Sequence, residues 1–136
     1  MGTVAGGSRW AQAPLSSGRF TVRPTVAAAG PISNILQAVL AALVFRAFTG
    51  PSDSMVLEIA FRAVQINLLL AFFNLVPIPP LDGGNVLAGL LPESAAAMFD
   101  TIRPFGFILL YALMLTGVLS SLILPPTIFM LELLLP

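Results

Sequence analysis

Asn67–Leu91 reads NLLLAFFNLVPIPPLDGGNVLAGLL, an apolar run that ends in three prolines and is followed by a single carboxylate, Asp82. Proline has no backbone N–H and its ring clashes with the preceding turn. The residue before a proline also avoids the helical region. A helix that enters this stretch is therefore expected to bend or end near Val76.

Asp82 is the residue of this stretch that most needs an explanation. A lone ionisable side chain at the end of a hydrophobic span is costly, and it points to a functional site. Gly83 and Gly84 follow it and allow the backbone to approach another group closely. The alternative is that Asp82 N-caps a short helix from Gly83 to Leu91, with its carboxylate accepting a backbone N–H. Both roles stay open, because a ligand also needs a fixed backbone.

Composition indicates the class of protein. Of 136 residues, 57% are hydrophobic and 9% are charged, whereas ordinary soluble domains have about 25% charged residues. The mean hydropathy is +0.98. These values predict an all-α polytopic membrane protein whose solvent is lipid. The net charge is zero, and the chain has no basic patch, which argues against nucleic-acid binding.

The hydrophobic runs predict about three transmembrane helices, at about residues 31–48, 56–76 and 105–124, plus short interfacial helices. The third is expected to end at Pro125-Pro126, with a tail too short to cross the bilayer again. Residues 1–25 are expected to form a cytoplasmic lead-in and residues 26–136 the membrane-embedded core. Arginines divide four to two in favour of a cytoplasmic N-terminus.

Several polar residues interrupt the predicted spans. Asn34, Asn67 and Asn74 are expected to face protein, because unpaired amides in hydrocarbon are costly. They either line a site or hold helices together by hydrogen bonds. Glu58 and Arg62 stand four residues apart in the favourable order, which predicts an ion pair at the membrane edge.

Two segments carry a family resemblance. Asn74–Gly84, NLVPIPPLDGG, resembles the NxxPxxPLDGG signature of the site-2 protease family of intramembrane zinc metallopeptidases. Ala29–Asn34, AGPISN, resembles the AGPxxN segment that lies one transmembrane helix earlier in that family. The resemblance implies that Asp82 is similar to the family's third zinc ligand. The motif also implies supporting roles for Gly30, Pro31, Asn34, Asn67, Asn74, Pro77, Pro80, Gly83 and Gly84.

The chain also departs from the family. Intact members carry an HExxH helix that supplies two histidine ligands and a glutamate base. This sequence contains neither histidine nor cysteine. A catalytic zinc usually takes three protein ligands and keeps one position open. The chain therefore resembles the C-terminal half of such a protease, with no catalytic residue of its own, and we expect that it does not hold zinc alone.

Two functions follow as hypotheses. The first is a fragment of a site-2-protease-like zinc metallopeptidase, inactive alone, whose intact relatives cleave membrane proteins or peptides. A partner segment bearing HExxH would complete it, and such a segment encoded upstream of Met1 would support this hypothesis. The alternative is a non-catalytic membrane protein that retains the fold and binds other membrane proteins. In either case the resemblance places the chain in the membrane, and we expect the plasma membrane of a prokaryote.

Overall fold

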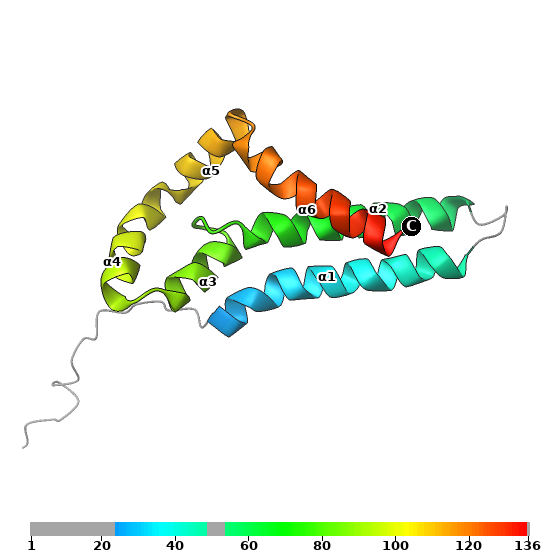
Figure 1. The fold of residues 1–136 in the computed structure, drawn as a ribbon, viewed down its shortest axis with the longest axis horizontal. Helices are drawn as coiled ribbons and strands as arrows, with labels where there is room; N and C mark the ends of the chain where they lie inside the picture. The colour runs from blue at the N-terminus through cyan, green and yellow to red at the C-terminus, as the bar shows by residue number, and fades with distance from the viewer. Residues whose placement is uncertain (1–23, 49–53, 136) are drawn as a thin grey trace, which may run out of the picture.

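The computed structural model describes residues 24–48 and 54–135, and every regular element in these ranges is helical (Figure 1). In chain order the elements are α1 (Pro24–Ala47), α2 (Ser54–Leu75), α3 (Asp82–Leu90), α4 (Glu93–Ile102), the 3-10 helix η3 (Arg103–Phe105), α5 (Gly106–Leu115) and α6 (Val118–Leu134). The predicted all-α class is confirmed for this part of the chain.

The two long helices α1 and α2 lie side by side and form the centre of the fold (Figure 1). Ala38 and Ala42 of α1 are buried against Val64 and Leu68 of α2. Alanines let two helix backbones approach closely, which favours packing in a membrane, where no hydrophobic force drives helices together. The C-terminal part of α6 packs against this cluster.

Charged side chains lie near the C-terminal ends of α1 and α6 and near the start of α2, and they make two polar interactions there. The Arg46 Nε donates to the Leu134 carbonyl at 3.2 Å, so the C-terminal end of α6 lies beside that of α1. Glu58 and Arg62 are 3.8 Å apart near the start of α2, which confirms the predicted ion pair. Both side chains are well exposed, so the pair contributes little to stability.

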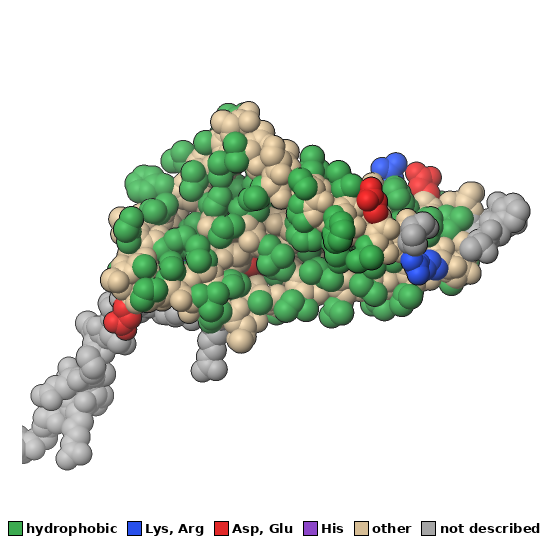
Figure 2. Space-filling view, in the orientation of Figure 1, with side chains coloured by type: hydrophobic (Ala, Val, Ile, Leu, Met, Phe, Trp, Pro, Cys, Tyr) green, Lys and Arg blue, Asp and Glu red, His purple; other side chains and the backbone are tan. Residues whose placement is uncertain are grey.

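The face seen in Figure 2 is largely apolar along the helices, and its charged side chains lie mostly near the two ends of the molecule. Leu40 and Leu69, on the outer faces of α1 and α2, are 62% and 44% exposed. Within residues 24–48 and 54–135, three helical segments are long and apolar enough to cross a membrane: α1, α2 and Glu93–Leu115. Apolar surface of this extent is stable in contact with lipid chains rather than water. The chain is an integral membrane protein.

The predicted third helix, over residues 105–124, is wrong as a single continuous helix. α5 ends at Leu115, and Gly117 has a φ of 76°, a left-handed conformation that suits glycine and ends helices. α6 then begins at Val118 and runs through Pro125 and Pro126. Glycine is common inside transmembrane helices, so the sequence did not mark this residue as a break. Prolines can be accommodated within membrane helices, so Pro125 and Pro126 do not end the helix as the sequence predicted.

The first helix also starts earlier than predicted. α1 begins at Pro24, so the last two residues assigned to the lead-in are helical. The remainder of the lead-in, residues 1–23, lies outside the described residues, as does the loop at 49–53.

Candidate metal-ligand site at Asp82

The chain between α2 and α3, residues 76–81, is a tight turn held by backbone hydrogen bonds. The Val76 N–H donates to the Phe73 carbonyl at 3.2 Å, the Ile78 N–H to Val76 at 2.8 Å, and the Leu81 N–H to Ile78 at 2.9 Å. Pro77 and the two prolines at 79 and 80 have no N–H to extend α2. The prolines therefore end α2 close to the predicted residue, and α3 starts immediately after the turn.

Gly83 and Gly84 let the first turn of α3 lie directly against this loop. A Cβ on Gly83 would collide with the Leu75 carbonyl, and a Cβ on Gly84 would lie 2.7 Å from the Ile78 carbonyl carbon. Both obstacles are backbone atoms, which cannot rotate away. Any larger residue at these two positions would push α3, and Asp82 with it, away from the end of α2.

Asp82 is the first residue of α3 and does not cap it. The N-cap residue is Leu81, and no side chain makes a capping hydrogen bond there. The Leu81 carbonyl instead accepts from Gly84 and Asn85 at 3.1 and 3.3 Å. The N-cap alternative for Asp82 is therefore wrong. Its half-buried carboxylate lies in the first turn, where the positive end of the helix dipole favours a negative charge.

The Asp82 carboxylate points at α1. A Cβ placed on Gly30 would lie 2.5 Å from the Asp82 Oδ2, so the oxygen occupies the space that a side chain at Gly30 would fill. Pro31, the next residue, is fully buried, and the Ser33 hydroxyl donates to the Gly30 carbonyl at 2.7 Å. The structure thus brings together the two segments that carried the resemblance, although they belong to different helices.

The other motif residues named from the sequence are half-buried or exposed. Asn34, Asn67 and Asn74 are all half-buried. The Asn67 Nδ2 donates to the Ala63 carbonyl of its own helix at 2.8 Å, so part of its hydrogen-bonding capacity is used locally. Pro77 and Pro80 are exposed on the turn.

Gly106 is a residue near the site that the sequence did not reveal. A Cβ at this position would collide with the Pro79 carbonyl, so the start of α5 is pressed against the turn that leads to Asp82. Gly106 is the buried residue of α5. A lone glycine at the start of an apolar run carries no motif, and only the fold shows that it faces the turn.

The residues present do not by themselves fit a complete zinc site. Within residues 24–48 and 54–135, no group of three or more histidine, cysteine, aspartate or glutamate side chains could hold a metal ion. Asp82 offers one carboxylate, and a zinc held by a single carboxylate would stay mostly hydrated and be lost easily. The site geometry is that of one ligand on a rigid support.

Comparison with known proteins agrees with the resemblance. The model of peptidase family M50 matches residues 49–117. The relatives that match include three proteins named "Putative zinc metalloprotease": YwhC of Bacillus subtilis, Rip2 of Mycolicibacterium smegmatis and MJ0611 of Methanocaldococcus jannaschii. No solved structure matches the chain at a comparable level of significance.

The relatives are longer than this chain. YwhC is 29% identical over 90% of the chain and 61% of its own length. Rip2 is 36% identical over 70% of the chain and 37% of its own length, and MJ0611 is 39% identical over 46% and 31%. The match to the family model covers half of the chain, including the Asp82 turn and α3. The chain belongs to peptidase family M50, the site-2 protease family.

Proposed function

We propose that this chain supplies the aspartate ligand and part of the membrane-embedded core of a site-2-protease-like zinc metallopeptidase. The observation that carries the proposal is the contact between Asp82 and Gly30. It places a carboxylate between membrane helices, on the first turn of α3, whose glycines lie directly against the backbone of the preceding turn. A ligand whose backbone is held in this way loses little backbone freedom when it binds a metal.

Within this proposal, the elements around Asp82 have separate structural roles. The turn at 76–81 and the glycines after it hold Asp82 in position, and Gly30 leaves the space into which its carboxylate projects. The apolar helices around the turn limit the access of bulk water. Zinc would supply Lewis-acid chemistry for peptide hydrolysis. The histidine ligands and the glutamate base would come from an HExxH-bearing segment outside these 136 residues.

The setting of the proposed enzyme follows from the same features. Its substrates would be membrane proteins or membrane-associated peptides, because the ligand lies among lipid-exposed helices. The named relatives come from bacteria and an archaeon, which supports the plasma membrane of a prokaryote as the location. The Asp82 turn would face the cytoplasmic side, as the arginine distribution predicts.

A second candidate is a membrane protein that keeps the M50 fold and binds other membrane proteins without cleaving them. The absence of histidine from these 136 residues favours this second candidate. The two candidates differ in whether an HExxH segment restores a hydrolytic reaction.

The deciding experiment measures cleavage of a membrane-protein substrate after co-expression with an HExxH-bearing segment of a relative. The chain alone is expected to show no cleavage, and the pair is expected to show cleavage that a chelator abolishes. Asp82→Ala should abolish the restored cleavage, whereas Glu93→Ala, at the exposed start of α4, should leave it nearly unchanged. Chelator-sensitive cleavage by the chain alone, or full activity in the Asp82→Ala pair, would contradict the proposal.

A further inference from the structure

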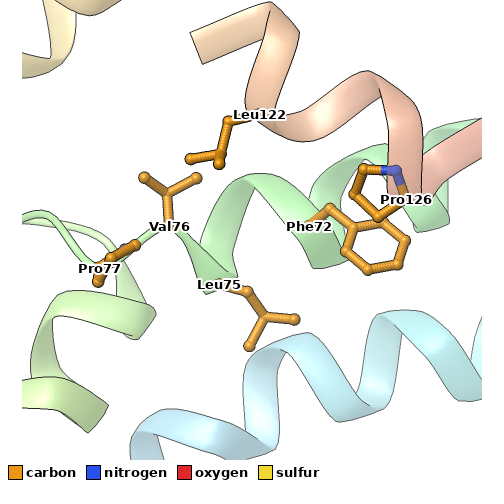
Figure 3. A pocket seen from close by; sticks show the side chains of 6 residues that line it. All are labelled: Phe72, Leu75, Val76, Pro77, Leu122 and Pro126. Atoms are coloured by element: carbon orange, nitrogen blue, oxygen red, sulfur yellow. The ribbon is translucent and has the colours of Figure 1, made fainter. Parts of the chain in front are cut away.

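α6 covers one side of the α1–α2 pair. On α2, the Phe72 side chain lines a pocket together with Leu122 and Pro126 of α6, so it points toward α6 (Figure 3). On α1, the Arg46 side chain binds the Leu134 carbonyl at the end of α6. Phe72 and Arg46 therefore mark the side of the pair on which α6 lies.

The opposite side of the pair carries amide side chains. Successive residues of a helix are about 100° apart, because 3.6 residues make one turn. Asn67 and Asn74 therefore lie about 140° and about 160° round α2 from Phe72. Gln37 precedes Arg46 by about two and a half turns of α1, which places the two on opposite sides of that helix. These three amides thus share the side of the pair that faces away from α6.

Asp82 lies at one end of this side. Its Oδ2 occupies the space that a side chain at Gly30 would fill. Gly30 precedes Gln37 by about two turns, or roughly 10 Å along α1, so the two residues share a face of the helix. Asn34 lies between them on the same face. We name this surface the amide face, and its side chains are Asn34, Gln37, Asn67 and Asn74.

Gln37 is the member of the amide face that lipid would solvate worst. It lies near the middle of α1, and its side chain is exposed, whereas Asn34, Asn67 and Asn74 are half-buried. Asn67 also donates to the Ala63 carbonyl of its own helix. An amide has two N–H donors and a carbonyl acceptor, and it is costly in hydrocarbon when unpaired. A neighbouring helix with a polar side chain at the same depth would remove this cost.

We propose that the amide face is the docking surface for the membrane helix that carries the HExxH ligands, with Gln37 hydrogen-bonded to a polar side chain of that helix. Asp82 determines this occupant, because a zinc ion needs further protein ligands, and they must reach a carboxylate at the end of the same face. A helix along this face passes both Asp82 and Gln37. Its polar partner for Gln37 therefore lies about two turns from its metal ligands. Lipid chains offer no hydrogen bond, and a second copy of this chain offers no histidine.

The inference rests on the proposed function, which supplies the occupant, but docking itself does not need metal. It is measurable with the complete 136-residue chain and an HExxH-bearing segment of a relative, reconstituted in lipid vesicles with a chelator present. Any association measured in this way comes from contacts between the helices and not from a shared zinc ion.

A photo-crosslinking amino acid at two neighbouring positions shows which face of α1 is covered. Val44 follows Gln37 by about two turns and shares its face, whereas Leu43 points about 120° away from Gln37. Val44 and Leu43 are 43% and 58% exposed, so exposure alone would favour crosslinking at Leu43. We expect the opposite result, with strong crosslinks to the HExxH segment from Val44 and few from Leu43.

Two amide variants test the hydrogen bond. Gln37→Leu is expected to weaken association about three- to tenfold, the effect of losing one interhelical hydrogen bond. The chain alone should fold at least as well, because leucine suits lipid better than glutamine does. Gln65→Leu is the matched control, since Gln65 precedes Phe72 by about two turns and faces α6. It should leave association unchanged. Energy transfer between fluorophores on the two segments measures both affinities.

Crosslinks from Leu43 as strong as those from Val44, crosslinks from Val44 to a second copy of the chain, or no crosslink from either position would overturn the inference. So would unchanged association in Gln37→Leu, or an equal loss in Gln37→Leu and Gln65→Leu. Failure of the proposed function has a different signature. In that case the Val44 crosslink and its weakening by Gln37→Leu persist, while no HExxH segment restores cleavage.

Discussion

At the scale of single residues, the site depends on the absence of a Cβ atom at Gly30 and Gly83. The space at Gly30 is filled by a carboxylate oxygen of Asp82, which is the movable end of a side chain. The space at Gly83 is filled by the Leu75 carbonyl, which is backbone. The sequence motif predicted that these residues matter, and the structure gives two different reasons. The same physics applies at Gly106, but no motif marks it, so the sequence could not predict it.

Substitution of these two glycines by alanine is expected to have different effects on the free energy of unfolding. Gly30→Ala should leave the free energy of unfolding unchanged or raise it by up to about 1 kcal/mol, because alanine favours helix and the carboxylate can rotate away. Gly83→Ala should lower it by about 1–3 kcal/mol, because a rigid backbone contact is overpacked. Thermal or denaturant unfolding in detergent measures both. Equal stability of the two variants would show that the turn does not press on α3 as described.

At the scale of elements, the long helices and the Asp82 turn could be predicted from sequence, but the arrangement after α4 could not. Apolar length predicted α1 and α2, and the prolines at 77–80 predicted the end of α2. The same rule failed at Pro125-Pro126, where the helix continues past both residues. The break is at Gly117, whose positive φ depends on the turn between α5 and α6 and not on any local signal.

Gly117→Ala distinguishes the observed break from the continuous helix that the sequence predicts. If the helix were continuous, alanine would stabilise it by about 1 kcal/mol. With φ at 76°, a Cβ is instead expected to cost about 1–2 kcal/mol. No atom lies within 4 Å of a Cβ built there, so the cost would come from the backbone alone. Gly117→Asn, which tolerates this conformation better, is the control and should cost less. A gain of stability in Gly117→Ala would contradict the break.

At the scale of the whole molecule, the contacts define how the chain crosses the bilayer. A Cβ on Gly89 would lie 2.6 Å from the Pro24 side chain, so α3 ends beside the start of α1. Arg46 binds the Leu134 carbonyl, so α6 ends beside the end of α1. If α1 crosses the membrane once, α2 crosses it back. The segment formed by α4, α5 and α6 then makes the third crossing, with a bend at Gly117.

A topology experiment tests this arrangement. Reporters fused after Ala47 and after Leu135 are expected to appear on the same side of the membrane, and a reporter after Leu91 on the opposite side. Appearance of the Leu91 and Leu135 reporters on one side would mean that the last helices form a hairpin across the bilayer. The arginine distribution further predicts that the Leu91 side is cytoplasmic.

Lipid accessibility gives a second test of the whole fold, and the chain has no native cysteine to interfere. A lipid-soluble thiol reagent should label a cysteine at Leu40, which is 62% exposed, and should miss one at Leu68, which is 0% exposed. Cysteines at Asn34, Asn67 and Asn74 are expected to label more slowly than at Leu40, because these residues are half-buried. Uniform labelling at all positions would show that the helices do not form a defined bundle.

The central claim is that Asp82 is a metal ligand held in place by α1 and the 76–81 turn. The most direct measurement is the zinc content of the purified chain together with an HExxH-bearing segment, after dialysis against a weak chelator. The account predicts about one zinc per complex for the native chain and for Glu93→Ala, and little zinc for the chain alone. Asp82→Ala is expected to weaken zinc affinity at least about tenfold, because loss of a group that only supports a ligand already costs about 10- to 100-fold. Native zinc content and affinity in the Asp82→Ala complex would contradict the account.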